Sequence, residues 1–138
     1  MHAVNIFSDY AFHYTSEEGI KGIIKSGKIN ASVAGNNDDA AFGENKVYMT
    51  SLHPEKYTPL QIAENNYDTS VDYEKSKLPS TKYAIGFEAK EIGAKPEPSK
   101  SRSIQTVEGD LDLSKAQVVY KQQNEKSYEL IWSKANKK

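Results

Sequence analysis

The apolar pattern near the start of the chain changes from strand-like to helical. Residues 10–14 form a short, mostly aromatic run, which predicts a buried strand. Three isoleucines then recur at helical spacing and predict a helix with one apolar face: Ile20, Ile23 and Ile24. Gly27 suits the end of this helix, because glycine accepts the left-handed conformation that is common there.

The predicted helix starts directly after the predicted strand. Thr15 and Glu18 form a T-x-x-E capping box, in which the hydroxyl and the carboxylate accept hydrogen bonds from exposed main-chain N–H groups. Gly19 and Gly22 each weaken a helix by about 1 kcal/mol relative to alanine, unless they allow close packing on a strand. Residues 29–32 are expected to form a second, short strand.

A polar segment, residues 33–45, separates these elements from the next strand. Loops of this length in a compact domain are often functional. Residues 47–51 predict the third strand. Thr58 and Gln61 form another capping box, with Pro59 at the first helical position, and predict a second helix.

The remainder of the chain is typical of β-structure. Four strands are predicted, over residues 82–88, 103–107, 116–121 and 128–132. Residues 68–81 and 91–101 are expected to be irregular, and residues 109–113 should connect two strands. Two early helices and late strands predict an α+β fold, with an antiparallel or mixed sheet bent around a cleft.

Composition narrows the classes of protein and site. A chain of 138 residues suits one domain, so residues 1–138 are expected to form a single domain. The absence of cysteine excludes disulfides and thiolate metal sites, and a net charge of −1 argues against a strongly electrostatic nucleic-acid binder. Apolar runs are short and the first residues lack a basic region, which fits neither a membrane span nor a signal peptide. We therefore expect a soluble chain, either cytoplasmic or secreted as an effector.

Several common catalytic motifs are missing from the sequence. No spacing of histidines and carboxylates suggests a metal site, and neither a Gly-rich phosphate loop nor a G-x-S-x-G elbow is found. Of the histidines, His2 is terminal and His53 stands beside a proline. This leaves His13 and Tyr48, each a polar aromatic residue in an apolar strand with a threonine close by.

The surroundings of His13 and Tyr48 resemble the ADP-ribosyltransferase toxin family that is named for its His-Tyr-Asp signature, whose small domains often form the toxic tips of polymorphic bacterial toxins. The matching pieces keep the order and approximate spacing of the family: Phe12-His13-Tyr14-Thr15, Gly19, Ile23, Ser26-Gly27, Asn36-Asn37, Asp39-Ala40-Ala41-Phe42-Gly43, Val47-Tyr48-Met49-Thr50, Pro54, Thr58-Pro59 and Leu111-Asp112-Leu113. The chain departs from the family at Lys46, where glycine is common, and at Asp110, where proline is common. These departures indicate a divergent branch.

The resemblance implies an ADP-ribosyltransferase-like split β-sheet around an NAD cleft, with two short helices and no metal. It implies that His13 binds ribose hydroxyls and that Tyr48 stacks on nicotinamide. Breaking the nicotinamide–ribose bond builds a cation on the sugar, which a carboxylate can stabilise. Asp112 matches the family's Leu-Asp-Leu element and is the first choice for this acid. Glu108 and Asp110 are the alternatives if the register differs by a few residues.

Residues beside the signature are expected to contribute to NAD binding. Tyr14, Thr15 and Thr50 flank the two signature residues in the matching strands. Tyr57 and Tyr67 could supply a second stacking face over nicotinamide, although packing in the core is the commoner role of a tyrosine.

The activity implied by the resemblance is transfer of ADP-ribose from NAD to a macromolecule, as a toxin or effector. NAD hydrolysis by a glycohydrolase is a close variant, because water competes when no acceptor is bound. An RNA 2′-phosphotransferase shares the broad fold but needs several basic residues, and Arg102 is the only arginine. A non-catalytic NAD or ADP-ribose-binding module and a plain interaction domain are the remaining alternatives. The expected acceptor is a protein rather than a nucleic acid, and an immunity or antitoxin protein is a further expected partner.

Overall fold

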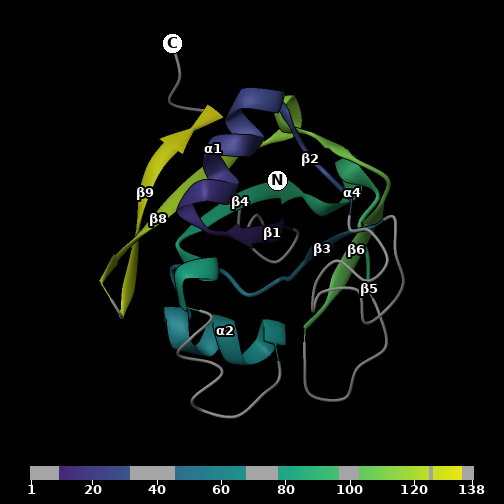
Figure 1. Ribbon diagram of the computed structural model, residues 1–138. Helices are drawn as coiled ribbons and strands as arrows, with labels where there is room; N and C mark the ends of the chain where they lie inside the picture. The colour runs from purple at the N-terminus through teal and green to yellow at the C-terminus, as the bar shows by residue number, and fades with distance from the viewer. Residues whose placement is uncertain (1–9, 32–45, 68–77, 97–102, 125, 135–138) are drawn as a thin grey trace.

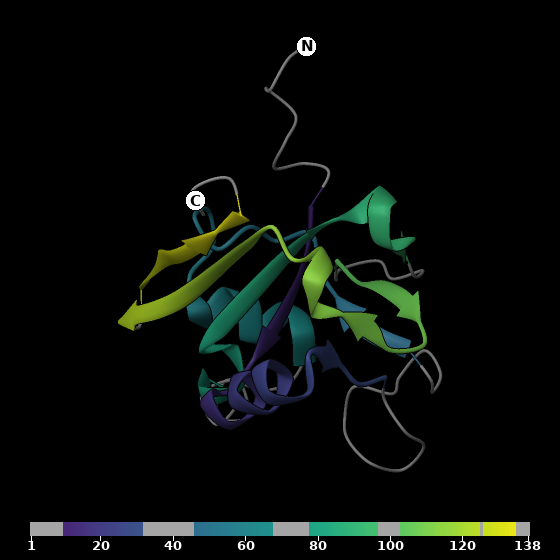
Figure 2. The same ribbon diagram turned by 90° about the horizontal axis from the view of Figure 1, so that it is seen from above.

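Antiparallel strands form the framework of the part that the computed structural model describes, which is residues 10–31, 46–67, 78–96, 103–124 and 126–134. A four-stranded sheet has the order β1-β4-β8-β9, with the bounds Tyr10–Thr15, Tyr83–Glu88, Val118–Asn124 and Ser127–Ser133. A three-stranded sheet has the order β3-β6-β5, with the bounds Lys46–Met49, Gln105–Glu108 and Lys95–Pro96. A small sheet pairs β2, Lys28–Ile29, with β7, Leu111–Asp112. Figure 2 shows the two larger sheets fanning out to opposite sides of β1.

Short helices lie on both sides of the four-stranded sheet. The helical segments are α1 (Glu17–Ser26), α2 (Pro59–Tyr67) and α4 (Ala89–Ile92), with the 3-10 turns η4 (Leu78–Thr81) and η5 (Leu113–Lys115). In Figure 1, α1 lies above β1 and β4, and α2 lies below them. The predicted α+β class is therefore confirmed by helices that pack on antiparallel sheets.

Side chains of β1 alternate between two separate core clusters. The first core cluster lies on the α1 side: Ala11, Ile20, Ile23, Ile29, Val47, Met49, Tyr83, Ile85, Phe87, Val107, Leu111 and Ala116. The second core cluster lies on the α2 side: Phe12, Tyr14, Ile62, Ala84, Tyr120 and Tyr128. Successive side chains of a strand point to opposite faces, so the single strand β1 holds both helices in place.

The predicted first strand and first helix are confirmed, with two corrections. Ser16 caps α1, because its hydroxyl accepts a hydrogen bond from the Gly19 N–H at 3.0 Å. The predicted capping box at Thr15 is wrong, since Thr15 still belongs to β1 and its hydroxyl fills the space where Gly19 would carry a Cβ. The buried stripe of α1 is also narrower than predicted, and Ile24 is 64% exposed. Gly27 ends the helix with a φ of 78°, as its position predicts.

The predicted start of α2 is confirmed in detail. The Thr58 N–H donates to Gln61 Oε1 at 2.8 Å, and the Gln61 N–H donates to Thr58 Oγ1 at 3.2 Å. These two bonds satisfy main-chain donors that have no partner within the first turn of a helix.

Several later elements differ from the sequence-based expectation. The second strand ends at Ile29 rather than at residue 32. The segment 91–101, expected to be irregular, contains the end of α4 and the short strand β5. The connection 109–113 contains β7, which pairs with β2 far away in the sequence. Residues 33–45 and 68–77 lie outside the described residues, and η4 follows the second of these segments.

Gly86 of β4 allows the ring of Phe12 to lie directly against the four-stranded sheet. A Cβ at this position would lie 2.7 Å from Phe12 Cε1 and 2.6 Å from Val118 Cγ2, closer than carbon atoms approach without displacement. Both contacts are to side chains of the sheet itself, and Phe12 is fully buried. The glycine is therefore required by packing on the second core cluster.

We expect Gly86→Ala to lower the free energy of unfolding by roughly 1–3 kcal/mol, because an added carbon overpacks this core. Gly22→Ala is the control, since a Cβ there meets nothing within 4 Å. That control should raise stability by up to about 1 kcal/mol through helix propensity. Urea denaturation of the two variants measures both values, and equal stabilities would contradict the packing argument.

Candidate functional site

The two larger sheets are joined where β1 meets the end of β3. The Phe12 N–H donates to the Thr50 carbonyl at 2.7 Å, and the Thr50 N–H donates to the Phe12 carbonyl at 2.9 Å. A regular antiparallel ladder would pair Tyr14 with Tyr48 next. The Phe12–Thr50 bridge is isolated instead, so β1 and β3 separate beyond it. We call the place where β1 and β3 separate the split.

His13 lies at the point where the two strands separate. Its Nδ1 atom is 3.0 Å from the main-chain carbonyl oxygen of Tyr48. A carbonyl oxygen can only accept, so Nδ1 carries the proton of this bond. In the neutral imidazole, Nε2 then holds a lone pair and can accept a hydrogen bond. The contact between Nδ1 and the Tyr48 carbonyl therefore fixes both the orientation and the tautomer of the imidazole.

Tyr48 is held in the three-stranded sheet opposite Thr106 of β6. Its neighbours Val47 and Met49 lie in the first core cluster, so alternation directs the Tyr48 side chain away from that cluster. The structure thus brings His13 and Tyr48 together through the imidazole and a main-chain carbonyl. A cleft shared by both rings remains a prediction.

Glu108 is the candidate acid that lies in the same sheet as Tyr48. The register of β3 and β6 pairs Lys46 with Glu108 and Tyr48 with Thr106. Residues two apart in a strand face the same side, so Glu108 and Tyr48 lie diagonally across one face of the sheet. Glu108 is exposed at the end of β6.

Asp112 and Asp110 form hydrogen bonds and an ion pair with residues in and next to the two-stranded sheet. The Asp112 carboxylate accepts a hydrogen bond from the Ser114 N–H at 2.9 Å, and this bond holds the pKa of Asp112 below its ordinary value. Asp110 accepts from the Ala31 N–H at 2.8 Å, which lowers its pKa, and pairs with Lys28 at 3.2 Å. Asp112 stands opposite Lys28 in the two-stranded sheet, so it does not share the β3–β6 ladder with Tyr48.

The other residues predicted to bind NAD have different surroundings. Tyr14 is buried and its hydroxyl donates to the Leu52 carbonyl at 2.7 Å, so its side chain is committed to the core. Thr15 packs on α1, as described above. Thr50 is 1% exposed. Tyr57 is 37% exposed in the segment between β3 and α2, whereas the side chain of Tyr67 lies outside the described residues.

The sequence analysis predicted no role for Asn65 of α2. Its side chain hydrogen-bonds to Thr50, which bridges β3 to β1, and to Ser103, which precedes β6. Its Nδ2 donates to the Ser103 carbonyl at 3.0 Å and to Thr50 Oγ1 at 3.3 Å. The Ser103 N–H donates back to Asn65 Oδ1 at 2.6 Å. Asparagine in a polar helical stretch is usually exposed, so nothing in the sequence pattern singles it out.

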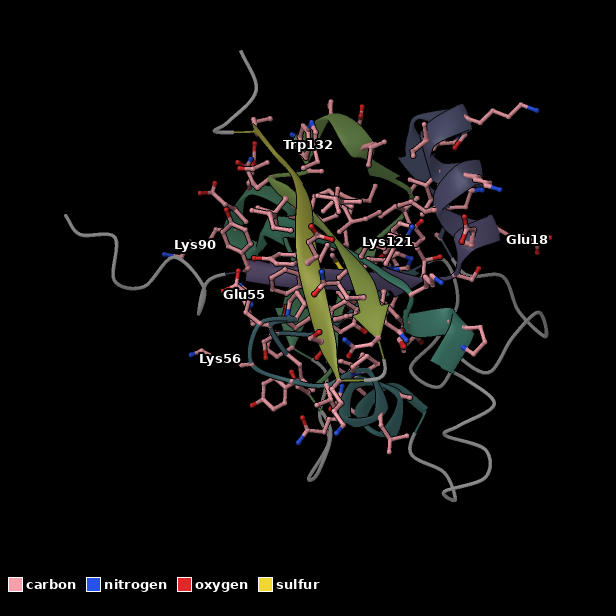
Figure 3. All side chains as sticks on the ribbon, turned by 90° about the vertical axis from the view of Figure 1, so that its left-hand side faces the viewer. Glu18, Glu55, Lys56, Lys90, Lys121 and Trp132 are labelled. Carbon is pink, nitrogen blue, oxygen red and sulfur yellow. The ribbon has the colours of Figure 1, made fainter. Side chains whose placement is uncertain are left out.

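His53, which has no obvious site context in the sequence, is buried behind the bridge. Its ring is 4% exposed and lies edge-on to Phe12 and Tyr120, with ring centroids 4.9 Å and 5.6 Å away. Its Nδ1 accepts a hydrogen bond from the Glu55 N–H at 3.0 Å. Glu55, labelled in Figure 3, also accepts a hydrogen bond from the Tyr120 hydroxyl. Burial lowers the pKa of His53, because it disfavours the charged imidazolium.

A match to a known family covers this whole arrangement. The model described as HYD1 signature containing ADP-ribosyltransferase matches residues 11–115. The chain belongs to this family. The matched part runs from β1 to η5 and includes His13, Tyr48 and all three candidate acids, and the family name implies an ADP-ribosyltransferase toxin domain. No curated protein and no solved structure matches the chain.

Two further observations concern metals and membranes. In the part of the chain that the structure describes, no three His, Asp or Glu side chains are grouped closely enough to hold a metal ion. None of the described helices is long and apolar enough to cross a membrane.

The lowered pKa of His53 predicts a pH dependence of stability. The unfolded chain binds a proton at this residue near pH 6.5, where the folded chain does not. The free energy of unfolding should therefore have its full value above that pH. It should decrease as the pH falls toward the lower pKa that His53 has in the folded chain. Urea midpoints measured between about pH 7.5 and pH 5 should show this loss. His53→Asn, whose Oδ1 can still accept from the Glu55 N–H, should flatten the dependence. An unchanged slope in this variant would assign the effect to another group.

Proposed function

We propose that this domain cleaves the nicotinamide–ribose bond of NAD and transfers ADP-ribose to a protein acceptor, as a toxin or effector. The observation that carries the proposal is the imidazole of His13 in the split between β1 and β3, bonded through Nδ1 to the Tyr48 carbonyl. This bond orients the ring and fixes its tautomer, in which Nε2 is the nitrogen that can accept and therefore the one that suits a ribose hydroxyl. The family match supports the same reaction class.

The edge of β1 in the split suits the carboxamide of nicotinamide. The main-chain groups of Phe12 face β3, so those of Tyr14, two residues along, face the same edge beyond the isolated bridge. One N–H and one C=O side by side match the oxygen and the NH₂ of an amide. The contribution of Tyr14 is therefore its main chain, while the ring of Tyr48 supplies a stacking face.

Glu108 is the acid that the placement favours, and Asp112 is the acid that the sequence motif favours. A carboxylate near the ribose stabilises the developing cation and accepts from the 2′-hydroxyl. The bond to nicotinamide breaks as the acceptor's nucleophilic atom bonds to the same ribose carbon, and the acceptor's proton is released to solvent. Nicotinamide leaves as a neutral molecule. If water attacks in place of the acceptor, the same site acts as an NAD glycohydrolase.

We expect Glu108→Gln to lower kcat for nicotinamide release by roughly a hundredfold to a thousandfold, while NAD binding changes little. Tyr48→Ala should weaken NAD binding as well, because stacking already acts in the ground state. The assay is nicotinamide release from NAD, with and without protein acceptors.

Asp112→Asn and Asp110→Asn are the matched controls, since their carboxylates bond to local main-chain N–H groups. If Asp112→Asn is inactive and Glu108→Gln is active, the acid is Asp112 and the placement argument is wrong. Full activity in all three variants would remove the carboxylate from the mechanism. A wild-type chain that binds NAD without releasing nicotinamide would indicate the non-catalytic module.

We also expect nicotinamide release to continue in the presence of EDTA. The proposed groups are an imidazole, a stacking ring, main-chain amides and a carboxylate, which together need no metal. Loss of activity on chelation, followed by recovery with a divalent cation, would contradict this mechanism.

A further inference from the structure

The split is closed at one end by the Phe12–Thr50 bridge, and we call this its closed end. A hydrogen-bonded network of side chains that belongs to neither sheet lies beside it. The main-chain register between β3 and β6 ends at the pair Met49–Gln105. Beyond it, the Ser51 N–H lies 3.2 Å from Ser103 Oγ, and the two serine hydroxyls are 2.7 Å apart. These contacts prolong the pairing of the two segments by side chains.

Asn65 of α2 closes this network from one side. Its amide binds both the N–H and the carbonyl of Ser103, at 2.6 Å and 3.0 Å, as a neighbouring strand would do. The same Nδ2 atom reaches Thr50 Oγ1 at 3.3 Å. One side chain thus bonds to the residue that leads into β6 and to the residue that bridges β3 to β1.

Contacts other than those of Asn65 also attach α2 to the sheet. Ile62 and Ala63 are fully buried, and Ile62 belongs to the second core cluster. The capping box of Thr58 and Gln61 fixes the start of the helix. The contacts of Asn65 are polar and directed at the bridge, which indicates a role in placing the strands.

We propose that Asn65 is a positioning residue for NAD cleavage. It fixes the place where β3 leaves β1, and so it sets the Tyr48 carbonyl against His13 and the β6 strand beside Tyr48. The proposal rests on the proposed function, because the rate to be affected is that of NAD cleavage. Small displacements of reacting groups reduce rates strongly, and about 1 Å can cost roughly a hundredfold.

The test combines a rate with a spectroscopic measurement on the full chain. Asn65→Ala should lower kcat for nicotinamide release by roughly tenfold to a hundredfold. It should also shift neutral His13 from the Nδ1–H tautomer toward the Nε2–H tautomer, as the Tyr48 carbonyl moves away. Imidazole ¹⁵N chemical shifts report the tautomer, and His53, whose Nδ1 accepts from Glu55, is an internal reference of the opposite kind.

Two variants of the same helix complete the experiment. Gln61→Ala removes the capping bond to the Thr58 N–H and leaves the network of Asn65 intact, so kcat and the His13 tautomer should stay at wild-type values. Asn65→Asp keeps an acceptor for the Ser103 N–H but sets a carboxylate oxygen against the Ser103 carbonyl, so it should also lower kcat and shift the His13 tautomer. It also tests the idea if the alanine variant does not fold.

Three results would overturn the positioning role. The first is a wild-type His13 tautomer in Asn65→Ala and Asn65→Asp, and the second is a shifted tautomer with an unchanged kcat. A rate loss of equal size in Gln61→Ala would also overturn it, since it would trace the effect to general weakening of α2. If the wild-type chain releases no nicotinamide, the proposed function fails, and the tautomer alone decides whether Asn65 sets the position of His13.

Discussion

The candidate site depends on the fact that β1 and β3 share one hydrogen-bonded pair and then separate. The bridge between Phe12 and Thr50 joins the two larger sheets, and the next pair of a regular ladder is not formed. Main-chain N–H and C=O groups of a strand need partners. The imidazole of His13 supplies one for the Tyr48 carbonyl.

The residues at the closed end of the split are completely or almost completely buried. Phe12 is fully buried between Gly86 on one side and the edge of the His53 ring on another. Thr50 is equally buried, and its hydroxyl oxygen also accepts a hydrogen bond from the Leu52 N–H at 3.2 Å. A rigid closed end fixes the directions in which the strands diverge.

The acidic residues near the end of the matched region differ in whether local hydrogen bonds occupy their carboxylates. Asp110 and Asp112 both accept from main-chain N–H groups, which lowers their pKa values and ties them to β2 and η5. A carboxylate that caps a turn is less available to a substrate. Glu108 pairs with Lys46 in the β3–β6 ladder and lies diagonally from Tyr48, so the pairing of the strands sets its position.

Local patterns in the sequence determined the elements whose stability is local. The capping box of α2 needs only neighbouring residues, and it is confirmed. The glycine that ends α1 has the same local origin. The aromatic run correctly predicts a strand at β1, but the pairing of that strand with β4 is long-range. The family resemblance points to His13 and Tyr48 as candidate site residues, because a motif keeps its order along the chain, and their roles remain a prediction.

Tertiary structure decided whatever depends on contacts between distant residues. The pairing of β2 with β7 is invisible in the sequence, since two residues per strand leave no periodic pattern. Thr15 and Ser16 are equally good caps by residue type. Ser16 is the cap because β1 extends to Thr15. Asn65 contacts Ser103 and Thr50 only because folding brings both residues to the same helix face. Hydrogen bonds act over about 3 Å, so a sequence can name the donors and acceptors while the fold alone decides which of them meet.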